Sequence, residues 1–343
     1  MNRRATLTLV VAMLVASACA STASAQAYCA LRDPAGQIAR VFPGTRYRSV
    51  VRTVSAQARQ AVARQLPPFT LHFNELGRHT LYVCYNRVDG RPAGLVHVRP
   101  ERNRRGIMEV LWALDANLTV IDFRFQRCRN RQRRTLESDA FKRQLRGKTL
   151  PQLRALLTPD GQKLKAGTGL EVPAAAADLA IAVLRCGMKT IAVTSEVWPD
   201  IVRNLKSQSE VTRQVGHTGP TRQVAVPYSP TVKALLDKRL IGKPATLDRK
   251  ATQAYQLFDQ QGRSAGFAIK TAWLGPPQLT LWWSIAADGK LTRVQPTSKW
   301  PDAEYPLAFN ALVGRKLEDF KNCQTAAELA ALEVLCVHAG VIQ

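Results

Sequence analysis

The chain carries the same succession of sequence blocks twice, and this duplication is the strongest limit on the fold that it can adopt. Each copy contains a tryptophan-bearing apolar stretch, a phenylalanine followed by a glycine, and an alanine-rich stretch that ends in cysteine. The landmarks keep their order in both copies, which favours two copies of one structural unit. The blocks are residues 106–123, 141–153 and 177–186 in the first copy and residues 278–294, 309–320 and 327–336 in the second.

The two copies differ in length at one place. Gly147 and Gly314 are 167 positions apart, whereas Cys186 and Cys336 are only 150 apart. The second copy is therefore about 17 residues shorter between its glycine and its last apolar stretch. A ligand site made by the missing loop can exist only in the first copy.

Runs of apolar residues, separated by turn residues, predict strands in the first copy. Asp115, Ala116 and Asn117 form one such turn, and the matching turn in the second copy is Asp288-Gly289, a strong hairpin signal. The pattern predicts an α+β fold of two repeated domains, each an antiparallel sheet with helices packed on one side. The expected strands of the first copy are residues 80–87, 94–100, 107–114 and 118–126.

Helical spacing of apolar residues predicts an amphipathic helix over residues 50–66 and a continuous alanine-rich helix over residues 174–188. Between them, residues 141–157 predict two short helices because Gly147 and Pro151 interrupt the pattern. Residues 206–230 mix polar residues with glycine and proline without periodicity, which is typical of a linker. The expected domains are residues 28–205 and 231–343, joined by the linker 206–230.

The first 25 residues have the pattern of a secretory signal peptide. Arg3 and Arg4 precede an apolar run from Leu7 to Val15, and small residues follow up to Ala25. The run is too short to span a bilayer, so we expect an exported, periplasmic, soluble chain. An alternative is lipidation at Cys19, which follows a loosely matching cleavage sequence.

The composition is strongly basic, with 49 Lys and Arg against 25 Asp and Glu and a formal charge of +24. Such a surface favours anionic partners, and outside the cytoplasm these are phospholipid headgroups, acidic envelope proteins and phosphorylated small molecules. Nucleic acid is an unlikely partner in that compartment. The alternative is that the basic residues only keep the protein surface hydrated and bind no particular partner.

Six cysteines follow the expected signal peptide, an even number that permits disulfides in an exported chain. No two of them have CxxC spacing, which argues against a thioredoxin-like site or a zinc ribbon. The preferred pairs are Cys323 with Cys336 and Cys128 with Cys186, and a buried free thiol is the alternative for Cys186 and Cys336. The six are Cys29, Cys84, Cys128, Cys186, Cys323 and Cys336.

No motif of a hydrolase, a metalloenzyme or a nucleotide-phosphate loop is present. The five histidines form no HExxH, and neither GxSxG nor GxxxxGK[ST] occurs. We therefore expect no catalytic residues and no metal site. A lone histidine in a strand, such as His97, is usually a core or surface residue.

The first copy resembles a known family in the order of its elements. A strand hairpin is followed by Phe141 ahead of Gly147-Lys148, then by a polar loop with small residues and an alanine-rich helix. This order resembles the FMN-binding domain of the flavoprotein subunits of Rnf and sodium-pumping quinone reductase complexes, and of standalone exported proteins. The resemblance covers residues 80–193 and, through the repeat, residues 255–336. It implies electron transfer next to a membrane redox complex.

In that family a threonine of an S/T-G-A-T-x-S motif takes FMN through a phosphoester bond. Aligning the helix places residues 168–173 over this motif, with Glu171 at the position of the acceptor threonine. A carboxylate cannot form that bond and repels phosphate, so the resemblance implies non-covalent FMN. A slip of one to three residues, which puts Thr168 at the acceptor position, is the alternative. The implied cofactor-binding residues in this region are Gly167, Thr168, Gly169, Glu171 and Lys148.

A dense series of arginines follows the last expected strand of the first copy. Arg127, Arg129, Arg131 and Arg133 alternate with other residues, so an extended segment would place them on one face. Such a face suits a phosphate or an acidic partner, which adds Arg127 and Arg129 to the candidate site. The alternative function is a flavin-free, basic binding or scaffold module for an acidic protein or an anionic envelope surface.

Overall fold

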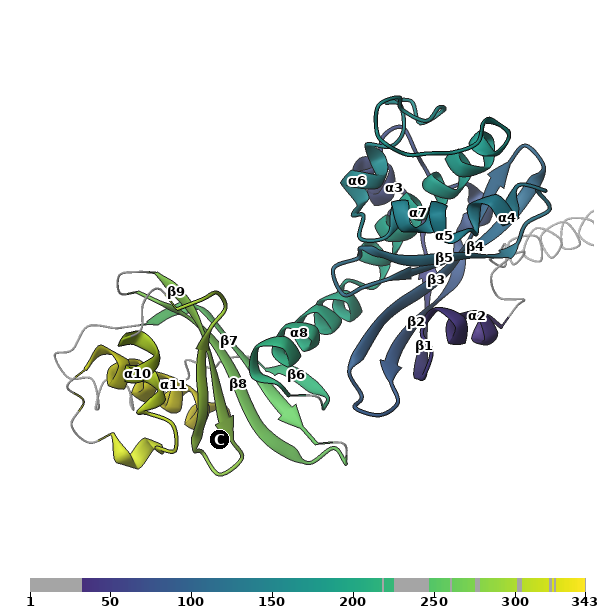
Figure 1. The fold of residues 1–343 in the computed structure, drawn as a ribbon. Helices are drawn as coiled ribbons and strands as arrows, with labels where there is room; N and C mark the ends of the chain where they lie inside the picture. The colour runs from purple at the N-terminus through teal and green to yellow at the C-terminus, as the bar shows by residue number, and fades with distance from the viewer. Residues whose placement is uncertain are drawn as a thin grey trace, which may run out of the picture. The chain divides into compact units, whose positions relative to one another are not determined.

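The computed structural model describes residues 33–217, 219–224, 247–259, 261–274, 278–300, 304–320, 323 and 325–342. The expected signal peptide, Cys19 and Cys29 lie outside these residues. The chain divides into two compact units (Figure 1). The first comprises Met1–Cys84 and Ala93–Val202, and the second comprises Tyr85–Pro92 and Arg203–Gln343.

The first unit is built on a five-stranded sheet with the order β1-β2-β3-β4-β5. In the antiparallel register His97 lies opposite Trp112, and Trp112 lies opposite Phe123. All four strands predicted for this copy are confirmed, within a few residues at their ends. The strands are β1 Thr45–Val54, β2 Gly77–Asn86, β3 Pro92–Asn103, β4 Gly106–Leu114 and β5 Val120–Arg127.

The second unit is also built on a five-stranded antiparallel sheet, with the order β10-β9-β8-β7-β6. Trp283 lies opposite Ile269 on one neighbour and opposite Val294 on the other. These pairings match those of Trp112, so the two sheets can be compared position by position. The strands are β6 Thr221–Val224, β7 Leu247–Phe258, β8 Ser264–Trp273, β9 Leu279–Ala286 and β10 Leu291–Pro296.

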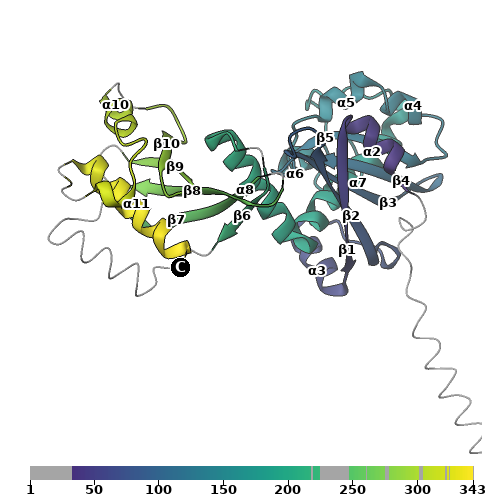
Figure 2. The same cartoon turned by 90° about the horizontal axis from the view of Figure 1, so that it is seen from below.

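One long helix packs on each sheet, α7 on the first and α11 on the second (Figures 1 and 2). The predicted α+β class is confirmed. A further helix covers the other face of each sheet: α2 packs on strands of the first sheet, and α8 packs on strands of the second. The main helices are α2 Ala35–Val41, α3 Ala56–Gln65, α7 Ala177–Val197, α8 Pro199–Val215, α10 Glu304–Asn310 and α11 Ala326–Ile342.

Short helices connect the last strand to the long helix of the first unit. The two short helices predicted over residues 141–157 are confirmed, since Gly147 separates α5 from α6. In the second unit, α10 and a 3-10 turn stand in the corresponding stretch. The short elements are α4 Arg133–Leu136, α5 Asp139–Leu145, α6 Leu150–Arg154, and the 3-10 turns η2 Phe73–Glu75, η3 Ala174–Ala176 and η4 Leu317–Asp319.

The glycine that follows the phenylalanine shared by the two copies makes the same backbone contact in both units. The N–H of Gly147 donates to the carbonyl of Val120 at 2.7 Å, and the N–H of Gly314 donates to the carbonyl of Leu291 at 2.7 Å. Both glycines have positive φ, 76° and 93°, which side chains disfavour. The repeat seen in the sequence is therefore also a repeat of backbone geometry.

Residues 50–54 form part of strand β1, so the helix predicted over residues 50–66 begins too early. The β-branched run Val50, Val51, Thr53 and Val54 favours a strand. Ser55 then caps α3, because its side chain accepts a hydrogen bond from the N–H of Ala58 at 3.2 Å. The strand lies at one edge of the sheet, and the side chains of Arg46, Tyr47 and Arg48 are exposed along it.

The linker prediction for residues 206–230 is wrong at two places. Residues 206–215 continue helix α8, and residues 221–224 form strand β6. Residues 206–215 are mostly polar but carry two apolar residues on one face of the helix. Val211 and Val215 of α8 pack against Tyr255 and Trp282 of the second sheet. Burial of these two residues stabilises a helix that the sequence alone does not reveal. Residues 225–246 lie outside the described part of the chain.

Gly187 of α7 lies against a fully buried ring, so we expect Gly187→Ala to destabilise the first unit. An added Cβ would meet two ring atoms of Trp112 at 2.6 and 2.7 Å. Overpacking of this kind costs about 1–3 kcal/mol. Denaturant unfolding followed by tryptophan fluorescence measures the loss. The matched control is Gly36→Ala in helix α2, where an added Cβ meets nothing within 4 Å; an equal loss there would contradict the explanation.

Candidate functional site

A cavity of about 570 Å³ lies between α5 and the segment before α7. Its two walls come from the two segments that the FMN-binding resemblance singled out, the phenylalanine-glycine box and the loop aligned with the flavin motif. Its apolar lining residues include Leu170 and Val172, which are partly exposed, and Leu136 and Phe141, which are buried. The lining residues are Thr135, Leu136, Ser138, Ala140, Phe141, Gln144, Leu170, Glu171, Val172 and Pro173.

The wall formed by residues 170–173 is held to α5 by a pair of hydrogen bonds. The backbone N–H of Glu171 donates to Gln144 Oε1 at 2.7 Å, and Gln144 Nε2 donates to the backbone carbonyl of Glu171 at 3.2 Å. The side chain of Glu171 is not needed for this contact. Among the described residues of the predicted site, Glu171 is the one that lines the cavity.

The other predicted residues of the loop lie in a surface turn. Gly167 and Gly169 have positive φ of 74° and 71°. Thr168 Oγ1 donates to the carbonyl of Lys165 at 3.1 Å. Lys148 follows α5 in the chain, and its carbonyl accepts from the N–H of Val120 at 3.0 Å. The structure does not gather these residues into the lining of the cavity.

The arginine series does not form one extended face, so that expectation is wrong. Strand β5 ends at Arg127, whose Nη1 lies 4.0 Å from Glu109 Oε1. Arg129 lies in an exposed loop beyond the strand. Arg133 begins helix α4, where its Nε donates to Glu137 at 3.0 Å. The turn at Asn130, whose side chain accepts from the N–H of Gln132 at 2.9 Å, breaks the extended course.

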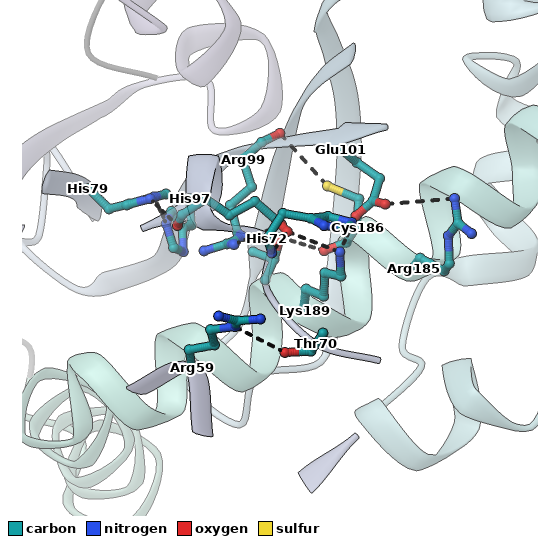
Figure 3. Close-up of polar contacts among 12 residues, drawn as sticks. Arg59, Thr70, His72, His79, His97, Arg99, Glu101, Arg185, Cys186 and Lys189 are labelled. Atoms are coloured by element: carbon teal, nitrogen blue, oxygen red, sulfur yellow. Dashed lines mark hydrogen bonds and ion pairs between the residues drawn. The ribbon is translucent and has the colours of Figure 1, made fainter. Parts of the chain in front are cut away.

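A second candidate site, which the sequence did not indicate, is a network of charged side chains inside the first unit (Figure 3). Arg99 and Glu101 project from β3, Lys189 projects from α7, and Glu75 ends the 3-10 turn η2. All four are buried, and Arg99 is 0% exposed. Ionised side chains are costly to bury, so each of them needs a partner.

Glu75 and Lys189 connect the network. Glu75 accepts from Arg99 Nη2 at 3.2 Å and from Lys189 Nζ at 3.2 Å. Lys189 Nζ also lies 3.0 Å from Glu101 Oε2, and Arg185 Nη2 lies 3.7 Å from Glu101 Oε1. The backbone N–H of His72 donates to Glu75 at 2.7 Å. The ion pairs therefore form one continuous chain from the sheet to the helix.

Two buried histidines adjoin the ion pairs. His79 Nε2 lies 3.0 Å from the carbonyl of Glu75, His97 Nε2 lies 3.4 Å from His79 Nδ1, and His97 Nδ1 lies 3.0 Å from Thr194 Oγ1. A carbonyl can only accept, so His79 donates through Nε2, and in the neutral ring Nδ1 accepts. His97 then donates to His79 through Nε2, and its Nδ1 can accept from Thr194. All three contacts are satisfied with both rings neutral.

The pKa values agree with neutral histidines beside an ionised Glu75. Burial and the charge of Arg99 lower the pKa of His79 to about 3 and that of His97 well below its usual value. Burial by itself would raise the pKa of Glu75, but the charges of Arg99 and Lys189 lower it overall. Burial raises the pKa of Glu101 against the attraction of Lys189.

The described part of the second unit has uncharged residues at the positions equivalent to members of this network. The registers that align Trp112 with Trp283 place Ile269 at the position of His97, Thr271 at that of Arg99 and Trp273 at that of Glu101. The alignment of Cys186 with Cys336 places Leu335 and Ala339 at the positions of Arg185 and Lys189. Since one unit of the pair folds with these uncharged residues, the fold does not require the charges.

The cysteines of the first unit that the structure describes are free thiols. Cys84, Cys128 and Cys186 carry no disulfide, so the suggested pair of Cys128 with Cys186 is not formed. Burial raises the pKa of Cys84 and of Cys186 to about 12. Cys323 and Cys336 are both buried in the core of the second unit, and their pairing stays a prediction.

Comparisons with known proteins returned no match: neither a family model, nor a curated protein, nor a solved structure matches this chain. Within the part of the chain that the structure describes, no helix has the length and apolar character needed to cross a membrane. The same residues contain no group of three or more His, Cys, Asp or Glu side chains that could hold a metal ion.

Proposed function

We propose that the first unit binds FMN non-covalently in the cavity between α5 and residues 170–173. The observation that carries the proposal is the cavity itself, because residues 170–173 of the segment aligned with the flavin motif line it together with Phe141 and Gln144 of the box that contains Gly147. When bound, the flavin would carry the electrons, and the protein would bind and orient it. The second unit, which is shorter at this loop, would serve as a scaffold or docking unit.

The lining suits the ring of a flavin better than its phosphate. Leu170 and Val172 offer partly exposed apolar side chains to a flat aromatic ring, whereas Leu136 and Phe141 are buried. The hydroxyls of Thr135 and Ser138 already donate, to Gln132 and to the carbonyl of Thr135, so toward a ligand they can only accept. Among the described lining residues there is neither a lysine nor an arginine, and Glu171 adds a carboxylate. The phosphate would therefore extend into solvent, away from Glu171, and the flavin would exchange freely.

The cellular setting that goes with this proposal is electron transfer outside the cytoplasm, next to a membrane redox complex. It is supported by the signal-like pattern of the first 25 residues and by the resemblance to exported flavoproteins. The strong positive charge would favour approach to an acidic partner or an anionic membrane surface.

We expect the purified chain to bind added FMN and to lose this binding in the variant Ala140→Trp. Ala140 lines the cavity and is exposed, so the larger side chain fills the space without disturbing the core. Quenching of flavin fluorescence measures the affinity, and riboflavin in place of FMN shows how much the phosphate contributes. The control Thr168→Ala changes the exposed turn and should bind as before.

Two results would overturn the flavin proposal: a chain that binds neither FMN nor riboflavin, or an Ala140→Trp variant that binds both as well as the parent. Flavin that remains attached after denaturation, and is lost in Thr168→Ala, would instead indicate a covalent bond at the alternative acceptor position.

A flavin-free binding module is the second candidate, and the lining of the cavity favours it. Glu171 lies at the position where the resembling family has the threonine that takes FMN. The described lining contains no lysine or arginine that could bind the FMN phosphate. The basic surface would then be the functional feature, with an acidic protein or anionic envelope surface as partner. Retention on vesicles containing anionic lipid should fall as salt rises from low to high concentration. Retention that does not change with salt would exclude this function.

A further inference from the structure

A pocket of about 330 Å³ opens from the surface onto the charged network of the first unit. Glu101 and Lys189 form part of its lining although both are less than 5% exposed. Figure 3 shows Arg185, Glu101 and Lys189 grouped at one end of the network, with His72 and Thr70 nearby. The lining residues are Pro68, Phe69, Thr70, His72, Glu101, Arg102, Arg185 and Lys189.

Several polar atoms around this pocket lack a hydrogen-bond partner within the described chain. They are Arg185 Nε in the lining, and Arg99 Nε and Nη1 behind it. Glu101 Oε2 has Lys189 Nζ as its partner at 3.0 Å. Buried donors of this kind are normally satisfied, in many binding sites by the ligand.

The charges at the pocket do not balance. Arg99, Arg102, Arg185 and Lys189 are positive, while Glu75 and Glu101 are the carboxylates that face them. The histidines are neutral, so the cluster has a formal excess of +2 from these residues. The four buried charges balance, and the excess comes from Arg102, which is exposed, and Arg185, which is partly exposed, so an anionic group would compensate it at the mouth of the pocket.

The duplication shows that the charges are not there to support the fold. The second unit has Trp273, Leu335 and Ala339 where the pocket has Glu101, Arg185 and Lys189. Trp273 is nearly buried and packs against Phe309 at 5.6 Å between ring centroids, so it occupies space inside the core of that unit. Replacement of buried ion pairs by apolar residues is often neutral or stabilising. A role in binding explains why the first unit keeps them.

We infer that this pocket binds a small molecule through an oxyanion, a carboxylate or a phosphate group. Arg185 and Arg102 recognise the oxyanion at the mouth, and Lys189 supplies positive charge from the floor. Glu101 accepts a hydrogen bond from a hydroxyl or amino group of the same molecule. The site is separate from the cavity between α5 and residues 170–173, so it does not depend on the flavin proposal.

The test is calorimetric titration of the intact chain with inorganic phosphate and with succinate, at constant ionic strength set with chloride. We expect saturable binding of at least one of them and a loss of tenfold or more in affinity in Arg185→Leu, which installs the residue found at the equivalent position of the second unit. Arg102→Leu, at an exposed position, should weaken binding without any risk to folding. Tighter binding of phosphate would indicate a phosphorylated ligand, and tighter binding of succinate a carboxylic acid.

The matched control is Arg315→Leu in the second unit, which removes a half-buried arginine from its ion pair with Glu328 at 3.1 Å. It should bind the oxyanion like the parent chain, and so should Ala140→Trp. The inference is overturned if neither phosphate nor succinate binds, or if Arg185→Leu and Arg102→Leu bind as tightly as the parent. Loss of oxyanion binding in Ala140→Trp would also overturn it, because the two sites would then not be separate.

Discussion

The variant Glu75→Gln should lower the free energy of unfolding of the first unit by about 3–5 kcal/mol. Glu75 is 3% exposed and is the carboxylate that contacts both Arg99 and Lys189. Glutamine keeps the shape but removes the negative charge, so Arg99 loses its ion pair while remaining 0% exposed. The cost comes from the unpaired buried cation and not from a lost contact area.

Pulse hydrogen exchange across a denaturant titration, resolved by mass spectrometry, measures the stability of each unit in the intact chain. The matched control is Glu210→Gln in the second unit, whose partner Lys270 lies at 2.7 Å with both side chains partly exposed. That pair is reached by solvent, so its loss should cost less than about 1 kcal/mol. Similar losses in the two variants would show that the network is screened and does not act as a buried ion cluster.

Acidification should destabilise the first unit through its two buried histidines. Their folded-state pKa values are depressed, to about 3 for His79, so the folded unit disfavours the proton that the unfolded chain takes up. The stabilisation is complete above about pH 6.5 and is lost progressively as the pH falls toward 3. Each histidine contributes a slope of about 1.4 kcal/mol per pH unit inside this window.

The variant His97→Ile, which installs the residue at the equivalent position of the second unit, should remove about half of this slope. Arg99 and Glu75 also face the histidines, and the lowered pKa of Glu75 adds its own loss of stability below about pH 4.5, in the lower part of the same window. Glu101 titrates in the opposite sense because its pKa is raised. The difference between variant and parent therefore isolates the histidine.

The same denaturant titrations at several pH values give the two slopes. His338→Leu serves as the control, because burial lowers the pKa of His338 to about 4 but the residue belongs to the second unit. It should leave the slope of the first unit unchanged. An unchanged slope in His97→Ile would show that His97 is protonated in the folded unit.

Much of the fold could be predicted from the sequence because it depends on local patterns and on the repeat. The strands from Gly77 to Arg127 follow apolar runs separated by turn residues, and the contact of Gly147 recurs at Gly314 because the same sequence block recurs. Where the prediction failed, tertiary packing decided. Val211 and Val215 lie on a helix only because the second sheet offers them a surface.

The charged network could not be predicted because its members come from separate elements. Glu75 lies in a 3-10 turn, Arg99 in a strand, and Lys189 in a helix 90 residues further on. One signal was present in the sequence: His97, Arg99 and Glu101 alternate on one face of a strand whose second copy has Ile269, Thr271 and Trp273. The site would have been indicated by the positions at which the first copy has charged residues and the second copy has uncharged ones, which a comparison of the shared landmarks alone does not show.

Strand β1 also bears on how the molecules behave toward one another at high concentration. An open strand edge can act as a template for a strand of another copy and so start aggregation. Arg46 and Arg48 bring positive charge to this edge, and a second copy would bring the same charge to meet it. Like-charge repulsion therefore opposes edge-to-edge pairing. The basic composition of the chain thereby reduces aggregation, and this effect is strongest at low ionic strength.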